Sequence, residues 1–157
     1  MLKIDRKVSL IVTLVLAIVA GGAMVFFAIY MPTYLKKLMD VLVAGGAHEA
    51  FNVYEQVLLY VSAYLALVLA AAWLVLVFML LRLVFRKQIF TKTAVALLRG
   101  ISWCLLFIGV IFCAVSFATL ISLLIGFVSL FFALCIRVIK NVLEEAVAIK
   151  EENDLTV

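Results

Sequence analysis

The longest stretch without a charged side chain extends from Gly100 to Ile136, which is 37 consecutive residues. As one α-helix this stretch would be about 55 Å long, because each helical residue adds about 1.5 Å. The hydrocarbon core of a bilayer is only about 30 Å thick. The stretch is therefore too long to cross a membrane once and long enough to cross it twice.

Two further uncharged stretches, Val8 to Leu35 and Gln56 to Leu81, precede it. In all, 69% of the 157 residues are hydrophobic and 14% are charged, whereas soluble domains are about half apolar and a quarter charged. A soluble chain of this size could not cover so much apolar surface. We therefore predict an all-α, polytopic membrane protein with four transmembrane helices arranged as a bundle.

The basic residues indicate which side of the membrane each end faces. They lie before the first span, between the second and third, and after the fourth, while the segment between spans one and two holds only Lys36 and Lys37. Basic residues near span ends concentrate on the cytoplasmic side. Four spans put eleven of the thirteen basic residues on one side, so we expect both termini to be cytoplasmic.

The expected segments follow from these stretches and from helix-breaking residues. Pro32 is expected to end the first helix, Gly45-Gly46 to end the second, and Thr93 to cap the third span. The first span is expected to be retained, because it is longer than the core of a signal peptide. We expect span 1 at 8–31, an outer interfacial helix at 33–44, a long helix containing span 2 at 48–86, span 3 at 93–115, span 4 with a cytoplasmic extension at 119–150, and a flexible acidic tail at 151–157.

The extension of the last helix is predicted to be amphipathic. Its apolar side chains recur at helical spacing and its polar ones fall largely elsewhere. The apolar stripe is Ile139, Val142, Leu143, Ala146 and Val147. We expect this stripe to pack on a partner, on another subunit, or on the loop after the second span.

Small residues recur along each span and favour close helix packing in lipid. The stripes are Ala17, Gly21 and Ala28; Ser62, Ala66 and Ala70; Gly109 and Cys113; and Ser122, Gly126, Ser129 and Ala133. We expect most of them to face other helices of the same chain. Their use as the seam of a homo-oligomer is an alternative.

No catalytic chemistry is evident in the sequence. The spans contain no internal ionisable residue of the kind that marks proton relays or substrate sites, and the single histidine, His48, reads as a solvated loop residue. The three cysteines, Cys104, Cys113 and Cys135, read as small buried hydrophobes. We expect neither an enzyme, a cofactor nor a metal site. The net charge of +4 is explained by membrane topology, so we expect no direct nucleic-acid binding.

Two charged clusters are the candidate interaction residues. The basic cluster between the second and third spans is interpreted as a topology signal and a contact for anionic lipid, or as a docking site. It comprises Arg82, Arg86, Lys87, Lys92 and Arg99. The acidic cluster on the extension and tail is the candidate partner-binding site. It comprises Glu144, Glu145, Glu151, Glu152 and Asp154.

Two stretches resemble landmarks of the YoaS-like proteins, a bacterial membrane-protein family of unknown function. The C-terminal stretch 142–157 is similar to that family's C-terminal signature. The stretch 89–101 is similar to an inner-loop motif, with Lys92-Thr93 where an acidic-Asn pair is common; this chain keeps Phe90, Thr91, Leu98 and Arg99. The resemblance implies a bacterial cytoplasmic-membrane protein whose gene neighbours often include a small Cro-like helix-turn-helix regulator. It implies no established activity.

Three functional interpretations remain open. In the first, the protein is a regulatory or interaction protein whose cytoplasmic helix and acidic tail hold a small helix-turn-helix regulator, since carboxylates can compete with phosphates for a basic protein surface. In the second, it is a pore, transport or immunity-type component. Its polar outer cavity would be lined by Tyr54, Tyr60, Tyr64 and Ser62. In the third, it is a structural subunit of a larger membrane complex.

Overall fold

The computed structural model describes residues 6–46, 50–86 and 88–155, with side chains from residue 11 to residue 153 within these ranges. The described residues form four α-helices, each long and apolar enough to cross a membrane. These are α1 (Arg6–Ala44), α2 (Val53–Phe85), α3 (Lys92–Ala114) and α4 (Leu120–Leu155). The all-helical prediction and the number of span-capable helices are confirmed, as expected for a multi-pass membrane protein.

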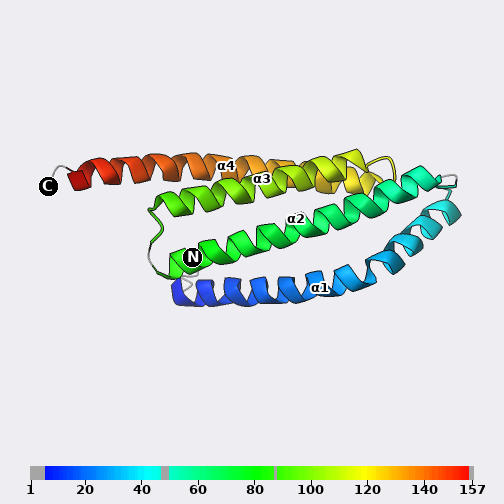
Figure 1. Cartoon of the computed structure of the whole chain (residues 1–157), viewed down its shortest axis with the longest axis horizontal. Helices are drawn as coiled ribbons and strands as arrows, with labels where there is room; N and C mark the ends of the chain where they lie inside the picture. The colour runs from blue at the N-terminus through cyan, green and yellow to red at the C-terminus, as the bar shows by residue number, and fades with distance from the viewer. Residues whose placement is uncertain (1–5, 47–49, 87, 156–157) are drawn as a thin grey trace, which may run out of the picture.

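The helices stand side by side in chain order, as an open row (Figure 1). Among the described residues, α1 packs on α2, α2 on α3 and α3 on α4, and no other pair of helices is in contact. The expected closed bundle is therefore wrong. In water a helix must hide its apolar faces, but in lipid these faces can remain exposed, so nothing forces the row to close.

The two ends of the row differ in charge. One end, here called the basic end, holds the start of α1, the α2–α3 loop and the protruding last turns of α4 (Figure 1). The opposite end holds the α1–α2 loop and the α3–α4 turn. A small apolar cluster closes that opposite end, where Met39, Phe51 and Leu59 pack with Val115 and Ala118. This cluster joins the α1–α2 hairpin to the α3–α4 turn.

Helix α1 continues through Pro32, so the separate interfacial helix expected at 33–44 is wrong. Met31, Leu35, Met39 and Leu42 keep one helical spacing across the proline, and Leu35 and Met39 are buried. This continuous apolar seam favours one long helix over two. Proline bends a helix because it lacks an N–H donor, and α1 bends in its second half (Figure 1). The Tyr60 hydroxyl of α2 donates to the Pro32 carbonyl at 3.5 Å.

Helix α2 begins at Val53, later than the expected start at residue 48. Residues 50–52 are not helical, and His48 and Glu49 lie outside the described residues. The backbone N–H of Asn52 donates to the Glu55 carboxylate at 2.9 Å, which satisfies the N-cap backbone. Before this loop, α1 ends next to Gly45-Gly46 as predicted, with Gly46 at a φ of 67° that favours glycine.

Helix α3 begins at Lys92, one residue earlier than expected, because Thr91 and not Thr93 is its N-cap. The Thr91 hydroxyl accepts a hydrogen bond from the Ala94 N–H at 3.3 Å. The turn to α4 lies near residues 116–119, as predicted, and Thr119 accepts from the Ser122 N–H at 3.2 Å. Helix α4 then continues to Leu155, so the flexible tail expected from residue 151 is wrong over its described residues.

The α3–α4 pair is the closest helix contact, and its small residues face each other as predicted. A Cβ built on Gly109 would lie 3.0 Å from the Gly126 carbonyl oxygen, so only glycines allow this approach. About two helical turns from these glycines, the buried Ser102 hydroxyl donates to the Ala133 carbonyl at 3.0 Å. This seam fixes the register in which α3 and α4 run past each other toward the basic end.

Candidate interaction site

The extension of α4 beyond the uncharged stretch packs on the first turns of α3. Val147 is buried and Leu143 and Ala146 are half-buried, so this part of the predicted stripe is confirmed. Val142 is 63% exposed and Ile139 is 57% exposed, so these two residues do not pack within this chain, and their packing on a partner or another subunit stays a prediction. Of the expected docking surfaces, the extension uses the chain's own segment that follows the α2–α3 loop.

Two charge pairs flank this contact and join the two candidate clusters. The Lys92 Nζ lies 3.0 Å from the Glu151 carboxylate, and an Arg99 guanidinium nitrogen lies 3.3 Å from the Glu144 carboxylate. The two pairs are seven residues apart on both antiparallel helices, so both can form in the same register of α3 against α4. All four side chains are at least half exposed, so water and salt screen both pairs and each contributes little to stability.

Glu144 is the centre of the charge network. Its other carboxylate oxygen accepts a hydrogen bond from Lys140 Nζ at 2.6 Å. The hydrogen bond and the positive charge of Lys140, with a smaller contribution from Arg99, hold the pKa of Glu144 below its ordinary value of 4.5. Glu144 is thus a stable carboxylate at neutral pH, bridging α3 and α4.

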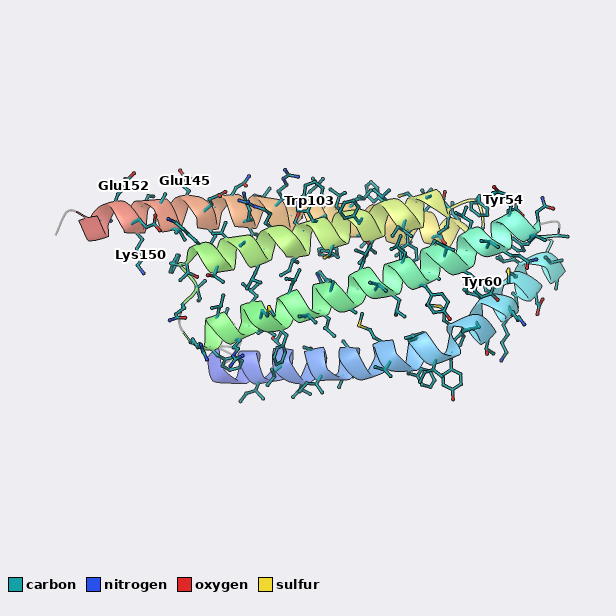
Figure 2. The ribbon with its side chains drawn as sticks, viewed as in Figure 1. Tyr54, Tyr60, Trp103, Glu145, Lys150 and Glu152 are labelled. Carbon is teal, nitrogen blue, oxygen red and sulfur yellow. The ribbon has the colours of Figure 1, made fainter. Side chains whose placement is uncertain are left out.

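Among the described residues, Arg82, Arg86 and Glu145 make no ion pair in this contact. Arg82 and Arg86 are exposed at the end of α2. Lys87 lies outside the described residues, as does the side chain of Asp154. Glu145 and Glu152 are exposed and project from α4 on the side away from α3 (Figure 2).

The face of α4 opposite α3 carries a second regular pattern. Its residues recur at alternating spacings of four and three, which is the spacing of a helix–helix seam. They are Val138, Val142, Glu145, Ile149 and Glu152, and all five are exposed. We refer to these five residues as the exposed seam.

Three further residues contribute to the basic end and were not among the candidate interaction residues: Trp103, Arg137 and Lys140. The Arg137 guanidinium lies over the Trp103 ring, 5.9 Å from its centroid, and Lys140 joins Glu144. A signal was present in the sequence. Arg99 and Arg137 are the charges on either side of the long uncharged stretch, and a short turn between two helices brings its two ends together.

At the other end of the spans, an apolar cavity of about 360 Å³ lies between α1, α2 and α3. Ser62 lines it, but its hydroxyl donates to the Leu59 carbonyl within α2. Tyr54, Tyr60 and Tyr64 are absent from this lining, so the four residues expected to form a polar outer cavity are not brought together there. Within the described ranges, no three His, Cys, Asp or Glu residues are grouped to hold a metal ion.

Comparison with known proteins identifies a family but no activity. A family model described as "Protein of unknown function (DUF2975)" matches residues 7–157. No curated protein and no solved structure matches the chain. The expectation of a family without known function agrees with this match, while the YoaS-like name stays a prediction. Because the match covers both hairpins and the α4 extension, the chain belongs to the DUF2975 family of proteins of unknown function.

Proposed function

We propose that this protein is a non-enzymatic regulatory protein of a bacterial cytoplasmic membrane, and that it holds a small helix-turn-helix regulator at the exposed seam of α4. The observation that carries the proposal is the position of that seam. Helix α4 protrudes beyond the other helices (Figure 1), and its exposed seam lies opposite the face that packs on α3. The resemblance to the YoaS-like proteins supplies the expected partner.

The chemistry of the seam favours a basic helical partner. Val142 and Ile149 supply β-branched apolar contacts, and Glu145 and Glu152 supply carboxylates at the alternate positions. Two copies of this seam would bring like charges together, which disfavours self-pairing. A surface that binds DNA phosphates carries Lys and Arg, so the same surface can be occupied by these carboxylates.

The proposal requires the basic end to face the cytoplasm. The described basic residues of the α2–α3 loop and of α4 lie at one end of the row, and the acidic groups of the extension lie at the same end (Figure 2). Basic residues near span ends favour the cytoplasmic side. The α4 extension would then meet cytoplasmic partners directly.

The test is co-purification with a small helix-turn-helix regulator of the kind often encoded beside YoaS-like genes, using the full chain in mild detergent. Ile149→Ala, on the seam, is expected to reduce recovery at least several-fold, and Glu145→Lys combined with Glu152→Lys to abolish it. Ile139→Ala is the matched control, because Ile139 is equally exposed but lies off the seam. Equal recovery with Ile149→Ala and Ile139→Ala, or with the Lys variants, would exclude the seam as the docking surface.

A further inference from the structure

The basic end carries a second surface, on the side of the α3–α4 pair where Arg99, Trp103 and Arg137 come together. Trp103 lies one helical turn beyond Arg99 on α3, and Arg137 of α4 lies over its ring. Lys140 lies one turn further along α4 and is only 13% exposed. Arg99 and Lys140 both contact one carboxylate, Glu144, so with Arg137 this surface carries three cations and one anion.

The depth of this surface places it at the edge of the hydrocarbon core. From Leu120 to Arg137, α4 rises about 26 Å, slightly less than the roughly 30 Å of a hydrocarbon core. Arg137 is the first charge after the uncharged stretch and makes no ion pair within the part of the chain that the structure describes. A guanidinium at this depth needs an anion, because an unpaired charge near hydrocarbon is costly.

The geometry of Arg137 leaves its donors available. The guanidinium carbon lies 5.9 Å from the Trp103 ring centroid, and no carboxylate among the described residues pairs with the Arg137 N–H groups, so these donors can bind a phosphate. Trp103 stacks on Phe107 with 5.6 Å between ring centroids, and both side chains are about half exposed. These two rings form an apolar track that leads from Arg137 into the bilayer.

From these observations we propose that Arg137, Arg99 and Trp103 form a binding site for the phosphodiester headgroup of an anionic phospholipid, with an acyl chain lying along Trp103 and Phe107. Excess positive charge favours an anionic lipid over a zwitterionic one, whose own ammonium group these cations would repel. This site is independent of the proposed regulator, because it lies on α3 and on a face of α4 outside the exposed seam.

The experiment uses Trp103 as the reporter. Trp73→Phe leaves Trp103 as the only tryptophan, and the full chain is placed in vesicles of phosphatidylcholine containing a minor share of phosphatidylglycerol. Bromines are carried on the acyl chains of one lipid or the other, so that quenching of Trp103 fluorescence reports which lipid is adjacent. We expect brominated phosphatidylglycerol to quench several-fold more per molecule than brominated phosphatidylcholine.

Three variants distinguish a specific lipid-binding site from nonspecific attraction of anionic lipid to surface charge. Arg137→Gln is expected to lower the preference about fivefold, the effect of one basic residue near a membrane surface. Arg137→Lys is expected to retain part of it. Arg86→Gln makes the same charge change at the end of α2, outside the Arg137–Trp103 contact, and is expected to leave the lipid preference read out at Trp103 unchanged. Circular dichroism checks that each variant keeps its helices.

Two results would overturn the proposal. Equal quenching by the two lipids, or equal loss with Arg86→Gln and Arg137→Gln, would show a diffuse charge effect without a site. Relief of quenching by millimolar inorganic phosphate would assign the site to a free anion and not to a lipid. Recovery of the regulator with Arg137→Gln tests the two proposals separately, since the seam is unchanged in that variant.

Discussion

At the scale of single residues, the contact between α3 and α4 depends on two missing side chains. A Cβ on Gly126 would lie 2.7 Å from the Cys113 sulfur and 2.9 Å from the Cys113 backbone nitrogen. The sulfur could move, but the backbone nitrogen belongs to the helix itself. Within lipid, where the hydrophobic effect does not hold helices together, such close packing is the main attraction.

We therefore expect Gly126→Ala to destabilise the protein by about 1–3 kcal/mol, the usual cost of overpacking. The measurement is unfolding in mixed detergent micelles with increasing sodium dodecyl sulfate, followed by circular dichroism. Gly22→Ala is the control, because nothing lies within 4 Å of its added Cβ. Equal stability of the two variants would mean that α3 and α4 are not held by this approach.

At the scale of elements, the α4 extension is held on α3 by a small apolar contact and by charges that water reaches. The pKa of Glu144 is lowered chiefly by Lys140. When folding lowers the pKa of a carboxylate, the ionised group stabilises the folded state at pH values above its unfolded pKa. This stabilisation is lost as the pH falls through the folded-state pKa. The contribution of Glu144 to docking of the extension is therefore fully present at neutral pH and is lost as the pH falls below about 4.5.

The expected outcome of acidification is faster amide exchange over residues 144–151 than over 120–136, measured by mass spectrometry from pH 6 to pH 3 after correction for the intrinsic rate. In Glu144→Gln the extension is expected to exchange faster already at pH 6 and to respond less to acid. A wild-type extension whose corrected exchange does not change with pH would contradict this role for Glu144.

The element boundaries show where prediction from sequence succeeded and where it failed. Long uncharged stretches located all four helices, because the cost of burying charge in lipid limits where spans can lie. Rules for single residues failed at Pro32 and in the acidic tail. At Pro32 the buried side chains of Leu35 and Met39 favour one continuous helix, and the acidic tail continues a helix that is held on α3 by the buried Val147.

The charge pairs of the candidate site illustrate a second limit. Both clusters were found in the sequence, but their mutual contact was not, since a helical pattern gives the face of each residue and not the neighbour it meets. The information was partly available. With a turn of a few residues, α3 and α4 must run antiparallel, so Arg99 and Glu144 lie at similar distances from that turn. The missing part was the rotation of each helix, which Gly109 and Gly126 determine.

At the scale of the whole molecule, the even number of spans places both described chain ends at the basic end (Figure 1). This arrangement follows from helix count alone, whereas the side of the membrane follows from the charge bias. The open row differs from the expected four-helix bundle, because the small-residue stripes predict that helices of the chain face each other but not which helices do so. In lipid those stripes need only one partner each.

We expect a fluorescent protein fused after Val157 to be folded and fluorescent in the cytoplasm, and alkaline phosphatase fused in the α1–α2 loop to be active outside it. The reason is the concentration of basic residues at one end. The reciprocal fusions serve as controls and are expected to be silent. Phosphatase activity from the C-terminal fusion would reverse the orientation and remove the regulator contact.

The row has one further consequence, for how the protein responds to force. Over the described residues, α2 is the one helix on which α1 packs along its length, and Met39 adds a small apolar contact with Val115 and Ala118 at the end opposite the basic end. A pull on the start of α1 would separate this helix from α2 first, at a low force. The α3–α4 pair, which is in close contact at Gly109 and Gly126, would stay intact. Pulling on the end of α4 would have to separate the α3–α4 pair first, at the largest force. The order of unfolding forces from the two chain ends therefore distinguishes an open row from a bundle in which α1 also packs on α4.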